Sequence, residues 1–103
     1  MIAKPVIRRA AADGDIGEAV DYYAVESVAT ADRFIDELKR NVDLIGKTPR
    51  IGSPRYSHEL SIAGLRFQKL GKFPYLMFYV EHEDYIDVLR VLHEHRDMPS
   101  QLN

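Results

Sequence analysis

The chain has 103 residues, which is the size of one domain and leaves no room for a second independent core. Hydrophobic residues make up 46% and charged residues 29%, which excludes a chain that stays disordered. The lack of cysteine excludes a disulfide scaffold, a thiolate zinc site and a cysteine nucleophile, and the net charge of −2 excludes capture by nucleic acid through bulk charge alone. With no apolar run as long as a membrane span and no signal peptide, we expect a cytoplasmic protein.

The first part of the chain is expected to form a short strand and a helix. Residues 2–8 are mostly apolar and are interrupted by Pro5, which lacks an N–H, so they fit an edge strand. Residues 10–26 have apolar side chains at spacings of three and four, which predicts a helix that Gly14 and Gly17 weaken. These apolar positions are Ala12, Ile16, Ala19, Val20 and Tyr23.

The second helix has the clearest pattern in the sequence. Thr30 is placed to cap it, and Asp32 lies in its first turn, where the helix dipole favours an acid. Gly46 followed by Pro49 predicts its end. Because only a few residues separate the two helices, we expect an antiparallel hairpin. One apolar stripe runs along this helix and consists of Ala31, Phe34, Ile35, Leu38, Val42 and Ile45.

Helical spacing disappears after Pro49, and three strands are expected in the second half. Residues 65–70 alternate between apolar and polar, residues 75–80 are apolar throughout, and residues 85–93 have apolar side chains on both faces. Their short connections require an antiparallel meander. The predicted fold is therefore α+β, with an N-terminal strand and an antiparallel helix hairpin packed on a small, mainly antiparallel sheet. The helices cover one sheet face, so we expect the other face to be exposed and to bind a partner.

Charge is unevenly distributed along the chain. Residues 10–46 contain nine acidic and three basic residues, whereas residues 47–72 contain six basic residues and only Glu59 as an acid. This middle segment predicts either a local basic face or an ordinary solvated loop and strand face, and the sequence leaves both open.

Short motifs follow one another along the chain in a recognisable order. The strongest single motif is Leu-His-x-x-Arg-Asp at residues 92–97. The others are Asp15-Ile16, Asp21-Tyr22-Tyr23, Ala31-Asp32-Arg33-Phe34, Pro49-Arg50-Ile51-Gly52-Ser53-Pro54-Arg55, Gly64-Leu65-Arg66, Phe73-Pro74-Tyr75, Phe78-Tyr79 and Val88-Leu89-Arg90-Val91. With this set, the chain, taken as a single domain over residues 1–103, resembles the ParE branch of the RelE/ParE superfamily, the toxin half of bacterial type II toxin–antitoxin pairs.

The resemblance implies a growth-inhibiting toxin that a ParD-like ribbon-helix-helix antitoxin holds inactive in a hetero-oligomer. Members of the ParE branch are understood to poison DNA gyrase by binding it. The resemblance implies no cofactor, no metal, no membrane and no sequence-specific nucleic-acid binding by the toxin alone. We expect the antitoxin tail to lie along the helix hairpin and an exposed sheet edge, with Tyr22 and Phe34 as candidate contacts.

RelE relatives share this fold but cut mRNA on the ribosome, which requires a base, a cation and an acid around one phosphate. Glu59, Arg66 and His93 are the candidates for these three roles. The nuclease pattern is incomplete, because Glu94 follows His93 where some nuclease relatives have an aromatic residue. We therefore expect a binding toxin rather than an enzyme, with a ribosome-dependent endoribonuclease as the alternative.

For a binding toxin, the candidate target contacts are Arg66, Arg90, His93 and Arg96. Both Arg66 and Arg90 interrupt apolar strands, and each carries a fork of N–H donors suited to an acidic or phosphate-bearing partner. His93 and His95 have strand-like spacing but no third ligand, so no metal site is expected. A third possibility is an inactive family member that serves only as a co-repressor or antitoxin partner.

Overall fold

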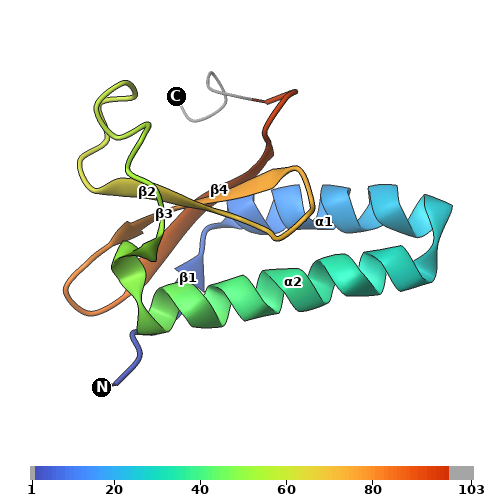
Figure 1. Cartoon of the computed structure of the whole chain (residues 1–103), viewed down its shortest axis with the longest axis horizontal. Helices are drawn as coiled ribbons and strands as arrows, with labels where there is room; N and C mark the ends of the chain where they lie inside the picture. The colour runs from blue at the N-terminus through green and yellow to red at the C-terminus, as the bar shows by residue number, and fades with distance from the viewer. Residues whose placement is uncertain (1, 98–103) are drawn as a thin grey trace.

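A computed structural model describes residues 2–97 and has two long helices lying side by side on one face of a sheet (Figure 1). In chain order the elements are β1 (Val6–Arg8), α1 (Ala10–Glu26), α2 (Val28–Lys47), the 3-10 helix η1 (Pro49–Ile51), β2 (Leu65–Lys69), β3 (Tyr75–Glu81) and β4 (Ile86–His93). The predicted succession of a strand, a helix hairpin and three strands is confirmed. Within the described residues, neither helix has the length and apolar character needed to cross a membrane.

The four strands form one mixed sheet in the order β1-β4-β3-β2. β2, β3 and β4 form the predicted antiparallel meander, and β1 pairs in parallel with β4 at the edge. The register between β3 and β4 shifts after Phe78, where Leu89 is the extra residue of a β-bulge. The expected α+β architecture with a mainly antiparallel sheet is therefore confirmed.

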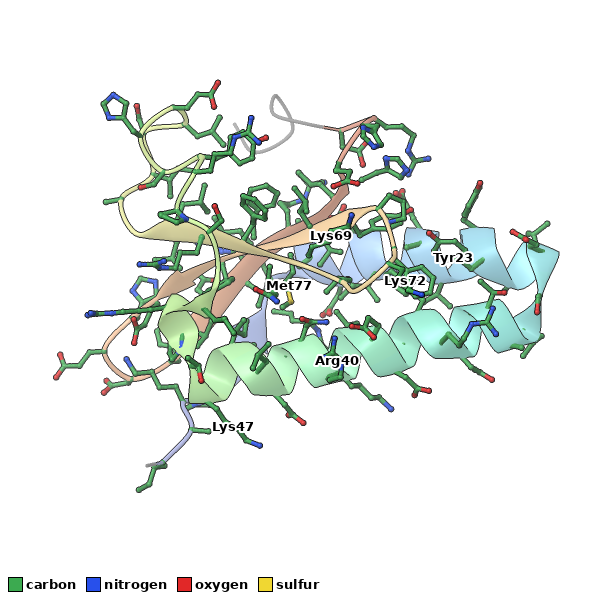
Figure 2. All side chains as sticks on the ribbon, viewed as in Figure 1. Tyr23, Arg40, Lys47, Lys69, Lys72 and Met77 are labelled. Atoms are coloured by element: carbon green, nitrogen blue, oxygen red, sulfur yellow. The ribbon has the colours of Figure 1, made fainter. Side chains whose placement is uncertain are left out.

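The helices pack on the sheet through a core rich in aromatic rings. Phe34 of α2 is fully buried, and its ring centroid lies 5.5 Å from that of Tyr23, 5.3 Å from Phe73 and 5.4 Å from Tyr75. Figure 2 shows Tyr23 reaching from α1 toward the β2–β3 turn and Met77 between the sheet and α2. Such ring pairs stabilise a fold by about 0.5–1.5 kcal/mol each beyond their buried area. They fix the hairpin firmly on the sheet.

The opposite face of the sheet is covered, so the prediction of an exposed apolar face is wrong. The loop between η1 and β2 folds back over this face and places Tyr56, Leu60 and Ile62 against it. The buried sheet residues under the loop are Leu65, Leu76, Phe78 and Leu92. Two backbone hydrogen bonds of 2.9 and 3.0 Å between Ser53 and Phe67 hold the loop to β2. Its apolar residues follow no period, so their packing role leaves no pattern in the sequence.

Two helix boundaries differ from those expected. α2 begins earlier than predicted because Ser27, rather than Thr30, caps it, and the Ser27 Oγ accepts a hydrogen bond from the Thr30 N–H at 3.3 Å. Gly46 does not end α2, which continues to Lys47. Gly46 is buried beside the segment that leads into β1, where an added Cβ would lie 3.0 Å from the carbonyl oxygen of Lys4. Gly46 is therefore needed because a neighbouring segment passes close to it, and not because the chain turns there.

Candidate functional site

An open apolar groove lies between α1 and α2, next to the end of β1. Its volume is about 340 Å³, within the range of sites that hold a ligand or a few partner side chains. The floor is formed by the apolar side chains of Ile16, Val20, Ile35, Leu38 and Val42. The rim carries the charged side chains of Arg8, Asp13, Lys39 and Asp43. An apolar floor with a charged rim suits an amphipathic segment of a protein partner.

The outer edge of β1 adjoins this groove. The Pro5 carbonyl and the Arg9 N–H point toward β4 and form hydrogen bonds of 2.9 and 3.0 Å with it. Because the backbone groups of alternate residues in a strand point to opposite sides, those of Val6 and Arg8 point outward. The Arg8 side chain lines the groove and donates from Nε to Asp13 Oδ1 at 2.7 Å. The groove and the strand edge therefore form one continuous surface.

The chain itself closes the other sheet edges. At β2, the outer side of the strand is bridged by the main chain of Ser53. Past the end of β1, two carboxylates cover the free side of β4. Asp15 accepts from the Val91 N–H at 3.0 Å, and Asp97 accepts from the His93 N–H at 3.1 Å. Among the described strands, β1 is therefore the edge on which a further strand can pair.

Arg90, one of the predicted target contacts, is bound by Asp15. The Arg90 guanidinium donates from Nε and Nη2 to the two carboxylate oxygens at 2.7 and 2.8 Å. The side chains are only 26% and 11% exposed, and the hydrogen bond to Asp15 raises the pKa of Arg90. The pair fastens α1 to β4, so any partner that reaches Arg90 meets a cation whose charge Asp15 already balances.

His93 and Arg96, two further predicted target contacts, line one cleft at the end of β4. The cleft has a volume of about 220 Å³ and is also lined by Tyr22 and Tyr75. Arg96 Nη2 donates to the Tyr75 hydroxyl at 3.3 Å, and the His93 ring meets the Tyr75 ring edge-to-face at 5.3 Å. Burial, followed by the nearby charge of Arg96, lowers the pKa of His93. The His93 Nδ1 accepts from the His95 N–H at 3.2 Å, as a neutral imidazole can.

Arg66 and Glu59 lie apart from this cleft. Arg66 is opposite Tyr79 in the β2–β3 pair, whereas His93 is opposite Tyr75 in the β3–β4 pair. With about 3.3 Å per residue and about 4.8 Å per strand, the two backbone positions are about 16 Å apart. Glu59 is exposed in the loop over the other sheet face. The three residues of the nuclease hypothesis are therefore not gathered around one point. Within residues 2–97, no three His, Asp or Glu side chains are grouped as a metal would require.

The two predicted antitoxin contacts differ in accessibility. Tyr22 is 62% exposed on α1, whereas Phe34 is fully buried against the sheet. The expected contact at Phe34 is corrected for this reason, because a side chain without exposed surface holds α2 in place and cannot touch a partner. Ile35 and Val42 line the groove instead. Both belong to the predicted apolar stripe of α2. That stripe is wider than packing on the sheet requires, and its extra width is the feature of the sequence that could have indicated the groove.

The sequence matches a family model over residues 6–98, a range that contains every described helix and strand. The family is described as the ParE toxin of type II toxin-antitoxin system, parDE. This chain belongs to the ParE toxin family. The resemblance inferred from the ordered motifs is thereby confirmed.

A solved structure also resembles this ParE family member. It is described as the chromosomal ParDE TA system from P. aeruginosa, and it is 18% identical in sequence. The superposition covers 88% of this chain and 96% of the other, with a TM-score of 0.72, which shows that the fold is shared. A search of curated proteins gave no match.

Proposed function

We propose that this chain acts in the bacterial cytoplasm as the toxin of a toxin–antitoxin pair, and that the antitoxin binds it along the hairpin groove and the β1 edge. Family membership over residues 6–98 supports the role as a toxin. The observation that carries the binding mode is the continuity of the groove, about 340 Å³ in volume, with the outward-facing backbone of β1.

The antitoxin in this proposal is a ParD-like ribbon-helix-helix protein with a tail that folds on binding. An apolar helix face fills the groove beside Ile35 and Val42, and an extended segment adds a strand to β1 through the main chain of Val6 and Arg8. A tail that is disordered when free must be ordered on binding, which lowers its affinity per unit of buried area. The same disorder exposes the free tail to proteolysis, which releases the toxin.

The target of the released toxin is DNA gyrase, which it poisons by binding. Membership of the ParE family supports this target. Candidate contacts are His93 and Arg96 in the C-terminal cleft, with Arg66 and Arg90 elsewhere on the sheet. The distance of about 16 Å between the positions of Arg66 and His93 favours binding over RNA cleavage. Cleavage needs its base, cation and acid around a single phosphate.

The proposal is tested by adding the purified chain to a gyrase supercoiling assay. We expect supercoiling to be lost or cleaved DNA to accumulate, and we expect the product of the neighbouring antitoxin reading frame to reverse the effect at an equimolar dose. Unchanged supercoiling at every toxin excess would contradict the gyrase target. If messages are then cut in a translating extract, the RelE-like endonuclease alternative holds. If induced cells grow normally without antitoxin, the chain is an inactive partner.

A further inference from the structure

Three arginines of the basic middle segment lie around the outer edge of β2, with Arg66 on the helix face of the strand and Arg55 on the face that the loop covers. Arg66 of β2 donates from Nη1 to the carbonyl oxygens of Arg50 and Gly52 at 3.2 and 2.7 Å, which places its guanidinium beside η1. Arg55 begins the next part of this loop, where its N–H donates to Ser53 Oγ at 3.2 Å. Ser53 is itself bridged to β2. We call Arg50, Arg55 and Arg66 the arginine surface.

The arginine surface carries positive charge that the described residues do not neutralise. Within residues 2–97, the ion pairs with carboxylates involve other cations. The hydrogen bonds of Arg66 use its Nη1, although a guanidinium has five N–H donors. Arg55 lies over the ring of Tyr56, with its Cζ 5.1 Å from the ring centroid. A cation–π contact holds the guanidinium without using its N–H donors.

Charge is separated along the length of the molecule. α1 contains five acidic residues and no Lys or Arg. The turn between α1 and α2 lies at the opposite end of the molecule from η1 (Figure 1). The longest dimension of the molecule is 39 Å. At low salt a polyanion is therefore repelled by the hairpin and attracted to the arginine surface, which favours one orientation of approach.

The loop that carries Arg55 also contains a hollow with a volume of about 460 Å³. No carboxylate lines it, and its residues are Pro54, Ser57, His58, Ser61 and Ala63. Hydroxyl groups and cations are the usual contacts of phosphate and sugar oxygens in nucleic-acid complexes. The Ser57 hydroxyl already donates to the Ile62 carbonyl at 3.0 Å, so the exposed Ser61 hydroxyl is the one in this hollow that can donate to a ligand.

We propose that the arginine surface binds the sugar–phosphate backbone of nucleic acid without reading its sequence. Each guanidinium presents paired N–H donors that match two oxygens of one phosphate. With only three phosphate contacts the isolated chain binds weakly, so the surface orients the protein on a target that already holds nucleic acid. A gyrase target supplies duplex DNA and a ribosomal target supplies RNA, and the chemistry recognised is the same in both.

Fluorescence anisotropy of the isolated chain with a labelled DNA duplex, and separately with a labelled RNA of equal length, tests this over a series of salt concentrations. Three phosphate contacts give a slope of log K against log salt of about −2.7 on duplex DNA. The double variant Arg50→Ala/Arg55→Ala should reduce the slope to about −0.9 and weaken binding about 50-fold at 0.1 M salt. The nucleic acid that binds with the higher affinity indicates whether the surface meets DNA or RNA on its target.

The matched control is the double variant Arg33→Ala/Lys72→Ala, which removes the same charge from exposed positions of α2 and the β2–β3 turn. Its affinity should stay within about twofold of the original chain, because long-range charge alone contributes little at this ionic strength. Equal losses for the two double variants, or no binding of either nucleic acid at low salt, would overturn the proposal. Because growth arrest and antitoxin binding are measured separately, such a failure would leave the proposed function standing.

Discussion

Asp15 and Arg90 join α1 to β4 through two hydrogen bonds of 2.7 and 2.8 Å between their charged groups. Asp15 also accepts from the Val91 N–H at 3.0 Å, so one carboxylate ties the helix layer to the sheet at three points. Charge-assisted hydrogen bonds of this kind are about twice as strong as neutral ones. The carboxylate also occupies the part of the β4 edge that β1 does not reach.

Asp15→Ala should destabilise the fold more than the loss of a surface carboxylate does. It leaves the Arg90 guanidinium and the Val91 N–H without this acceptor, and we expect the free energy of unfolding in urea to fall by about 3 kcal/mol. Asp13→Ala is the control, because its pair with Arg8 is exposed, and it should cost less than about 1 kcal/mol. Similar losses for the two variants would show that Asp15 forms an ordinary surface pair.

Ser27→Ala should lower stability by about 1 kcal/mol, because the Ser27 hydroxyl caps α2 by accepting from the Thr30 N–H. Thr30→Ala should cost about 0.5 kcal/mol or less, since its hydroxyl accepts only an exposed hydrogen bond from Arg33 at 3.0 Å. Thermal unfolding midpoints of the two variants measure this difference. A larger loss of stability for Thr30→Ala than for Ser27→Ala would show that Thr30 caps the helix, as predicted from the sequence.

Tyr79→Phe should loosen η1 from the sheet. The Tyr79 hydroxyl donates to the Pro49 carbonyl at 2.6 Å and accepts from the Gly52 N–H at 3.0 Å, and burial raises its pKa. We expect a loss of about 1–3 kcal/mol and faster hydrogen exchange at the Gly52 amide, which is left without its acceptor. Tyr85→Phe makes the same chemical change at a partly exposed position and should change neither the free energy of unfolding nor the hydrogen exchange at Gly52. Unchanged exchange at Gly52 in the Tyr79 variant would refute this role.

The stability of the protein should depend on His93 in mildly acidic solution. Burial first, and then the charge of Arg96, hold the pKa of folded His93 below its ordinary value of 6.5, although Asp97 and Glu94 act in the opposite direction. The unfolded chain therefore binds the proton more readily. The contribution of His93 is complete above pH 6.5 and is lost as pH falls from 6.5 through the folded pKa.

Urea denaturation between pH 7 and pH 5 measures this contribution, with an NMR titration of the imidazole as the direct reading. His93→Gln should reduce the difference between the free energies of unfolding at pH 7 and pH 5, because it removes the titrating ring while keeping a polar side chain. A folded-state pKa of His93 above 6.5 would reverse the predicted sign.

The order and type of the elements could be predicted because the apolar period changes at one place in the chain. Helical spacing holds up to Ile45, and alternating or continuous apolar residues begin at Leu65. The N-cap was misplaced because Ser27 and Thr30 are both good capping residues and only the backbone distinguishes them. Gly46 carries the signal of a helix end, but the contact that requires it is with Lys4, far away in sequence.

The candidate site was predicted less completely than the fold, for a physical reason. Local spacing identified Arg90 as an unusual cation within an apolar strand. Its partner Asp15 is 75 positions away in sequence, and spacing patterns cannot predict a contact between residues so far apart. The same limit applies to Arg66, whose partners are backbone carbonyls. At the end of β4, His93 and Arg96 are close in sequence and line one cleft, and their role as target contacts stays a prediction.

The docking of an antitoxin on the hairpin is tested most directly by calorimetric titration of the neighbouring-frame antitoxin into Ile35→Glu and Val25→Glu. Ile35 lines the groove, whereas Val25 is 90% exposed outside that lining. We expect Ile35→Glu to weaken binding about 50-fold, because the complex would bury a carboxylate against apolar side chains. Val25→Glu should bind as the original chain does, with both variants folded by circular dichroism. Undiminished affinity of Ile35→Glu would contradict docking in the groove between α1 and α2.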